Sequence, residues 1–179
     1  VAMREGVHIA SVVTHGHPAG IDAAVVTAKA VALAAVAPQI ETVPFLESLA
    51  DTAESEPLKY ALPRLADWTA LSESAALEAI VEASQKKPME GFGINVTAAP
   101  TVLAALYCFL MTPDDYPATI NRALRVGGDV DTVAAIAGAI SGARHGLAAI
   151  PSNLRKTLID GDEIEALGRA LFEARGRAA

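Results

Sequence analysis

The chain has 179 residues, with 14 basic and 21 acidic side chains, so its formal net charge is −7. This length suits one domain with its own core, and an apolar fraction of 52% is too high for a disordered chain. The acidic balance argues against an extended phosphate-binding surface, which needs clustered Lys and Arg. Nucleic acid is therefore not expected as the main partner.

A single cysteine, Cys108, lies in an apolar run and excludes an intrachain disulfide and a multi-cysteine metal site. No signal peptide is visible, and charged or proline residues interrupt the longest apolar stretches before they reach the roughly 20 residues of a spanning helix. We therefore expect a cytoplasmic protein without membrane contact. The chain opens on Val1-Ala2-Met3-Arg4, without an initiator methionine, as a piece of a longer protein would.

Helical patterns follow one another along the chain, and strand signals are scarce. Asp22 is expected to begin the first helix, Ser72 to cap a later one, and the sequence Thr112-Pro113-Asp114 to cap another. The pattern predicts a single all-α domain over residues 1–179, compact and built from several helices. The predicted helices are 23–36, 43–53, 58–68, 72–82, 100–111, 114–126, 132–146 and 162–175.

The sharpest chemical feature is the sequence Gly127-Gly128-Asp129-Val130-Asp131-Thr132 at the start of a predicted helix. Two carboxylates and a hydroxyl so close together offer hard oxygen ligands, which suit Mg²⁺, Mn²⁺ or Ca²⁺. An Asp before a helix is also a favoured N-cap, and acidic residues there complement the helix dipole. The spacing leaves metal binding and helix capping both open.

The helix that follows carries Gly138, Gly142 and Gly146 at four-residue intervals. One of its faces is therefore bare backbone, which predicts close packing against another helix. Such packing would hold the acidic loop rigidly, as a metal site requires.

Two histidines, His15 and His17, alternate in a loop just before a predicted buried helix. His-x-His can bind zinc, but no third ligand stands beside this pair. A hydrogen bond from one histidine to a ligand oxygen and a structural role in the loop are the alternatives.

The segment 86–95 is the main irregular one, with Gly91-Phe92-Gly93 at its end. It fits an ordinary connection between helices, or a loop in which the backbone approaches a ligand. Nucleophilic and hydride chemistry gain little support, because Cys108 and Ser141 lie in predicted helices and Gly91-Phe92-Gly93 lacks the strand and third glycine of a dinucleotide-binding loop.

The run from Gly127 to Ala143 resembles the C-terminal signature of the ADP-ribosylglycohydrolases, the group that includes dinitrogenase reductase-activating glycohydrolase. The similarity continues to Pro151, and further landmarks of the family are matched in the same order by Ala2-Met3-Arg4, Thr14-His15, Gly91-Phe92-Gly93-Ile94 and residues 103–110. The resemblance implies an all-α fold and a binuclear magnesium centre, with Mn²⁺ as an alternative metal. It also implies hydrolysis of the bond between ADP-ribose and a modified protein side chain or small molecule.

The same resemblance implies particular site residues, and ADP-ribose or an ADP-ribosylated substrate as the partner. The implied metal ligands are Asp129, Asp131 and Thr132. The implied substrate-binding residues are His15, Phe92, Gly93, Ile94 and Gly128.

The chain departs from the family at its start. The N-terminal portion of family members supplies a Thr-Asp-Asp set of metal ligands and an acidic catalytic residue, and nothing in this sequence matches either. The catalytic acid is therefore expected in an N-terminal segment or second chain that is absent here. Alternatively, the chain is a catalytically inactive paralogue that binds ADP-ribose or has a structural role.

Overall fold

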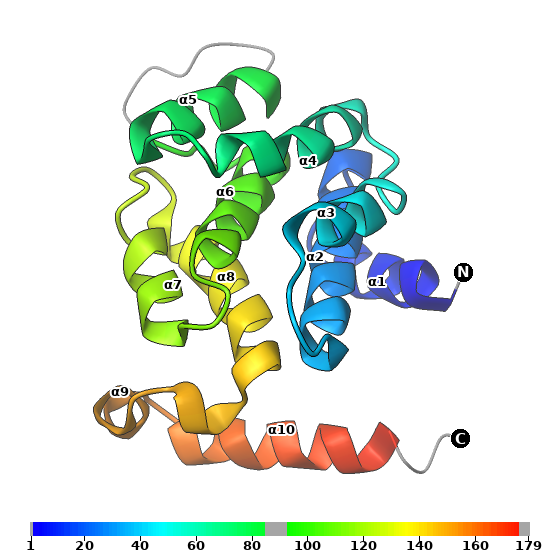
Figure 1. Ribbon diagram of the computed structural model, residues 1–179. Coiled ribbons are helices and arrows are strands. Elements are labelled where there is room, and N and C mark those ends of the chain that lie inside the picture. Colours follow the sequence, from blue (N-terminus) through cyan, green and yellow to red (C-terminus); the bar gives the residue numbers. More distant parts are fainter. Residues whose placement is uncertain (1, 85–92, 176–179) are drawn as a thin grey trace.

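The computed structural model describes residues 2–84 and 93–175, apart from the side chain of Arg175. The described residues form α-helices joined by loops, with one 3₁₀ turn and no sheet (Figure 1), so the all-α prediction is confirmed. The helices are α1 (Ala2–Val12), α2 (Pro18–Val36), α3 (Thr42–Ala50), α4 (Glu56–Trp68), α5 (Glu73–Ser84), α6 (Ala98–Met111), α7 (Tyr116–Ala123), α8 (Val130–His145), α9 (Ser152–Thr157) and α10 (Gly161–Arg175), and the 3₁₀ turn is Leu147–Ala149.

Helix α6 forms the centre of the fold. Every residue from Pro100 to Leu110 is buried, and a helix that is apolar on nearly all sides needs neighbours all round it. Helices α2, α4, α5, α7 and α8 are those neighbours, and Figure 1 shows α6 among them. Cys108 lies in this core, as predicted.

Helices α2 and α8 pack against each other and run in the same direction (Figure 1). Arg144, near the end of α8, donates from Nη1 to the carbonyl of Ala37, the C-cap of α2, at 3.1 Å. The same guanidinium pairs with Asp114. Because their C-terminal ends are tied together, the N-terminal ends of both helices lie at the other end of the pair. His15 and Asp129, which precede these helices, therefore share that end of the domain.

The glycine-bearing face of α8 packs against another helix, as predicted. That helix is α7, which the sequence did not identify as the neighbour. A Cβ atom on Gly138 would lie 3.1 Å from Ile120 Cδ1, and one on Gly142 would lie 3.8 Å from Tyr116 Cε2, so α7 covers this face. Gly146 has a different role. It ends α8 with a positive φ of 71° and has no atom near the position of a Cβ.

Several predicted helix boundaries are corrected. Helix α2 begins at Pro18 rather than after Asp22, because the ring Nδ1 of His17 accepts the N–H of Ala19 and Pro18 suits the first helical position. Helix α7 begins with Asp115 as its N-cap, since Asp115 Oδ1 accepts the N–H of Ala118 at 2.9 Å. The expected cap at Ser72 is confirmed, because its hydroxyl accepts the N–H of Ala75.

The expectation that no apolar stretch is long enough to span a membrane is corrected at α2. Among the described helices it is long and apolar enough to cross a membrane by length and composition alone, although Asp22 and Lys29 lie within it. In this structure it packs against α1, α3, α6 and α8, as a central helix of a folded domain does.

Helices α1 and α9 were not predicted, and neither contains a buried residue. Helix α10 was predicted, and its apolar face is exposed to solvent at Ile164, Leu167 and Leu171. Helical periodicity identifies an element most clearly when one face is buried, and α1 meets the rest of the fold mainly through α2.

A buried carboxylate joins α1, α2 and the start of α4. Asp22, which is 3% exposed, accepts the N–H of Glu54 at 3.0 Å and the N–H of Ser55 at 2.8 Å. Arg4 of α1 contributes a charged hydrogen bond to the same carboxylate at 3.3 Å, and it also donates to the carbonyl of Thr52. Burial raises the pKa of Asp22, but these hydrogen bonds outweigh it and hold the pKa below its ordinary value.

We predict that Asp22→Asn lowers the free energy of unfolding by about 2–3 kcal/mol at pH 7, because an amide cannot accept all three donors and removes the buried charge that pairs with Arg4. Urea unfolding followed by far-UV circular dichroism measures this loss. The exposed Asp51→Asn is the matched control and should change stability by less than about 0.5 kcal/mol.

The same carboxylate predicts a pH dependence. Since the pKa of Asp22 is lower in the folded state than in the unfolded state, its stabilisation is complete at neutral pH and is lost as the pH falls below about 4. The difference between the unmodified chain and Asp22→Asn should therefore shrink between pH 7 and pH 3. A difference that stays constant over this range contradicts the assignment.

Candidate functional site

Two segments far apart in the sequence meet through their backbones. The N–H of Ile94 donates to the carbonyl of Gly127 at 3.1 Å, and the N–H of Asp129 donates to the carbonyl of Ile94 at 2.8 Å. The two segments thus form a short parallel pairing between Ile94 and Gly128. This pairing brings together three of the predicted substrate-binding residues and the first predicted metal ligand.

The pairing leaves no room for side chains at two positions. A Cβ on Gly128 would lie 2.0 Å from the carbonyl oxygen of Ile94, and one on Gly93 would lie 2.2 Å from the carbonyl carbon of Gly127. Both glycines also have a positive φ, 70° at Gly128 and 97° at Gly93, which other residues rarely adopt. Glycine is therefore required here for close backbone approach.

The acidic loop presents its oxygen atoms at the start of α8. Asp129 occupies the N-cap position, but its side chain makes no capping hydrogen bond and instead accepts the hydroxyl of Thr132 at 3.0 Å. Asp131 Oδ1 accepts the N–H of Thr132 at 2.9 Å. The neighbouring Asp129 carboxyl and the N–H of Thr132 hold the pKa of Asp131 below its ordinary value. Asp131 is therefore ionised at neutral pH. Helix capping does not explain the Asp129 side chain, because that side chain makes no capping hydrogen bond.

The oxygen donors of this loop are of the kind that Mg²⁺ prefers, and they could supply part of its ligands. Asp131 and Thr132 are exposed and Asp129 is half-buried, so two carboxylates and a hydroxyl are open to a hydrated cation. These are fewer donors than the six of an octahedral magnesium ion, although water usually fills part of that shell. Across residues 2–84 and 93–175, no group of three or more His, Cys, Asp or Glu side chains is placed to hold a metal ion.

The histidines divide into two roles. His17 caps α2, which is the structural role considered for this loop. His15 is exposed, and its Nδ1 is 2.9 Å from the hydroxyl of Thr14. It lies at the same end of the α2–α8 pair as Asp129, but no hydrogen bond joins it to the acidic loop within the described part of the chain. Phe92 lies outside the described residues.

The other groups considered for chemistry are buried. Cys108 is fully buried, and burial raises the pKa of its thiol to about 12, so it is a thiol rather than a nucleophilic thiolate. Ser141 is also fully buried, inside α8. The expectation that neither residue carries covalent chemistry agrees with this placement.

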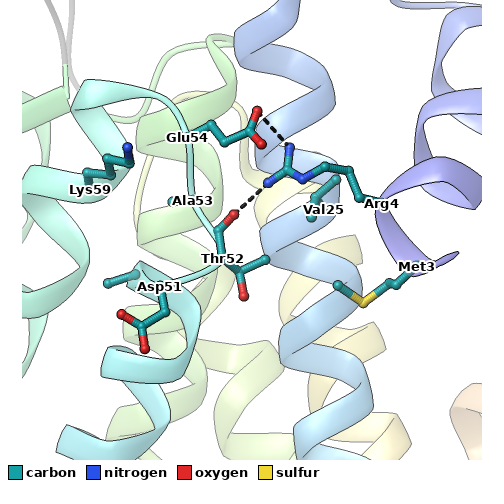
Figure 2. A pocket seen from close by; sticks show the side chains of 9 residues that line it. Met3, Arg4, Val25, Asp51, Thr52, Ala53, Glu54 and Lys59 are labelled. Carbon is teal, nitrogen blue, oxygen red and sulfur yellow. Dashed lines mark hydrogen bonds and ion pairs between the residues drawn. The ribbon is translucent and has the colours of Figure 1, made fainter. Parts of the chain in front are cut away.

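A cavity of about 680 Å³ lies between α1, α2, the connection from α3 to α4 and Lys59 of α4. Figure 2 shows Arg4 on its wall, held by the carbonyl of Thr52 and by Glu54. None of the predicted site residues lines this cavity. Its charged wall residues are of both signs, because Lys59 and Arg4 stand with Asp51 and Glu54.

Asn95 is a polar residue of this region that the sequence analysis did not single out. It follows Ile94 directly, and its Oδ1 accepts both the N–H of Thr97, at 2.9 Å, and the hydroxyl of Thr97. Its carbonyl accepts the hydroxyl of Thr101 at 3.0 Å. The signal was available in the sequence, because Asn two residues before a Thr that precedes a helix is typical of an Asx turn.

We predict that Gly128→Ala destabilises the chain by at least about 3 kcal/mol, since the new Cβ collides with backbone and the residue keeps an unfavourable φ. Thermal and urea unfolding measure the loss. Gly20→Ala is the matched control, because nothing lies within 4 Å of its Cβ position in α2, and it should be neutral or stabilising by about 0.5–1 kcal/mol. Equal stability of the two variants would refute the close approach.

The chain is similar in sequence to proteins of one known family. A family model described as ADP-ribosylglycohydrolase matches residues 2–179. ADP-ribosylhydrolase ARH3 of Bos taurus is 33% identical over 98 residues, which are 49% of this chain and 27% of that protein, and ARH3 of Homo sapiens is 32% identical with the same coverage. An uncharacterized protein of Archaeoglobus fulgidus is 28% identical over 171 residues, which are 94% of this chain and 50% of that protein.

The matched part of the chain thus spans half or less of the length of these relatives. The family model, in contrast, covers the chain almost from end to end. The chain belongs to the ADP-ribosylglycohydrolase family.

Proposed function

We propose that this chain takes part in Mg²⁺-dependent hydrolysis of the glycosidic bond that links ADP-ribose to a modified protein side chain or small molecule. In this proposal it supplies the C-terminal half of the metal site through Asp129, Asp131 and Thr132. The observation that carries the proposal is the acidic loop itself, which the backbone of Ile94 holds in place in a chain of this family.

The chemistry of the loop suits this reaction. Bound Mg²⁺ would act as a Lewis acid, offset diphosphate charge and lower the pKa of a water molecule. The carboxylates of Asp129 and Asp131 would also offer negative charge to a sugar held at this loop, since cleavage of a glycosidic bond develops positive, oxocarbenium-like charge. The imidazole of exposed His15 can donate to a ligand oxygen at the same end of the domain.

The remaining parts of the machinery are proposed to lie outside this chain. The matched relatives are longer, so a preceding segment or a second chain could supply the other metal ligands and the acidic catalytic residue. The alternative function is that of a catalytically inactive ADP-ribose-binding or structural paralogue. The observation behind this alternative is that the acidic loop supplies only part of a metal ligand set among the described residues.

We predict that the chain binds ADP-ribose only in the presence of a divalent cation, because Asp129 and Asp131 repel a diphosphate unless a metal reverses the local charge. Isothermal titration calorimetry with ADP-ribose, in Mg²⁺ and then in excess chelator, measures this dependence. Binding that is unchanged by the chelator favours the inactive ADP-ribose-binding paralogue, and no binding in either condition favours a structural role.

We predict that Asp131→Ala lowers ADP-ribosyl hydrolysis by at least about 100-fold in a preparation that is active with ADP-ribosylated protein, since a ligand to a catalytic metal contributes several kcal/mol. Release of ADP-ribose at saturating Mg²⁺ is the measurement. Asp67→Ala is the matched control, because Asp67 is an exposed Asp on α4, and it should keep full activity. Unchanged turnover of Asp131→Ala would count decisively against the proposed function.

A further inference from the structure

Helix α10 carries an apolar stripe that the rest of the described chain leaves exposed. Ile164, Leu167 and Leu171 are spaced three and four residues apart, so they lie along one side of the helix. These residues are 55%, 70% and 74% exposed, and α10 lies along the edge of the fold, packed mainly against the short helix α9 (Figure 1). A helix of 15 residues is only marginally stable in water by itself, so burial of this stripe would stabilise it.

The middle of this stripe allows a second backbone to come close. Gly168 is four residues after Ile164 and three before Leu171, so it lies on the same side of the helix. No atom of another described element lies within 4 Å of the position that a Cβ on Gly168 would take. The distance between two packed helices depends on the side chains at their contact, so a glycine there permits a close approach. Gly138 and Gly142 of α8 already pack against α7 in this way.

The charges of α10 and its flanking residues are divided between the two ends of the helix. Residues 160–168 contain four acidic side chains and no basic one, whereas residues 169–177 contain three basic and one acidic. A second α10 packed in the opposite direction would place each acidic end beside a basic end, and one packed in the same direction would place like charges together. The division also suits the dipole of α10 itself, but that effect does not require an exposed apolar stripe. Stripe and charges together favour a second copy of the same helix as the occupant.

We propose that α10 forms the interface of a homodimer in which the two helices pack antiparallel. Ile164 of each copy would contact Leu171 of the other, and the two Gly168 residues would face each other near the twofold axis. Such an axis brings the same patch of both copies together, so the patch has to be complementary to itself, as the stripe and the charges are.

The proposed interface is separate from the acidic loop and does not depend on the proposed function. Helix α10 follows the C-terminal end of α8, whereas the acidic loop lies at the N-terminal end. A helix of 16 residues puts about 24 Å between these two ends. Dimerisation through α10 would therefore leave the acidic loop of both copies open.

Sedimentation velocity of the whole chain at rising concentration tests this interface. A pair of 15-residue helices is a small interface, so we expect a dimer dissociation constant in the micromolar range. Leu167→Lys should raise this constant at least about 100-fold, because each dimer would lose two buried leucines and bury two charges. Val13→Lys is the matched control, because Val13 is 82% exposed and lies outside α10, and it should associate like the unmodified chain. An unmodified chain that stays monomeric up to about 200 µM, or a dimer that Leu167→Lys leaves intact, overturns the proposal.

Disulfide cross-linking tests the orientation of the two helices, and it covers the case in which Leu167→Lys unfolds α10. The native Cys108 is fully buried, so it should contribute little background. Gly168→Cys should oxidise to a covalent dimer, because the two introduced thiols would lie opposite each other. Gly6→Cys is the matched control, because Gly6 is also an exposed helical glycine with nothing within 4 Å of its Cβ position, and it should stay monomeric.

A mixture of Ile164→Cys and Leu171→Cys completes the test. In the antiparallel dimer these two variants should cross-link to each other far more than either does to itself. Preferential cross-linking of Ile164→Cys to itself would mean parallel helices and overturns the proposal. Equal cross-linking of Gly168→Cys and Gly6→Cys overturns it as well, because random collision would then explain both.

Discussion

The hydrogen bonds between Ile94 and the loop 127–129 are the constraint on which the candidate site depends. They fix the backbone before α8, and with it the directions in which Asp129, Asp131 and Thr132 project. The contact is made between main-chain atoms, so it requires glycine at positions 93 and 128 and does not depend on most of the side chains nearby. Helix α7 then holds α8 from the side through its glycines. The acidic loop is thus rigid for reasons that lie outside the loop.

Charged groups inside the fold tie together segments that are distant in sequence. Asp22 of α2 is hydrogen-bonded to Arg4 of α1 and to the N–H of Ser55 at the start of α4. Arg144 of α8 is hydrogen-bonded to the carbonyls of Ala37 at the end of α2 and Pro113 in the loop before α7. Each group has several partners, which is what makes a buried charge tolerable. These two side chains hold opposite ends of α2. The orientation of α2 beside α8, and the position of His15 at the same end of this pair as the acidic loop, follow from them.

The sequence predicted what local patterns can specify. The apolar run of α6, the cap at Ser72 and the packing face of α8 depend on residues close together in the chain, and all three are present. Asp22 was misassigned because an Asp before a helical run is a local cap signal, whereas its actual partners are the N–H groups of Glu54 and Ser55. The pairing of Ile94 with Gly128 depends on the tertiary fold, so no spacing in the sequence indicates it. The resemblance to a known family had placed both segments in one site, and their residue roles stay predictions.

The common direction of α2 and α8 shapes the electrostatic potential of the molecule. Each helix N-terminus carries about half an elementary positive charge from its aligned peptide groups, and here two such ends face the same way. A net charge of −7 is an average over the whole chain and conceals this local field. These main-chain dipoles oppose the negative charge of Asp129 and Asp131 at the start of α8, and they persist when individual side chains are replaced. Replacing Lys and Arg residues one at a time would therefore miss this main-chain contribution to the potential.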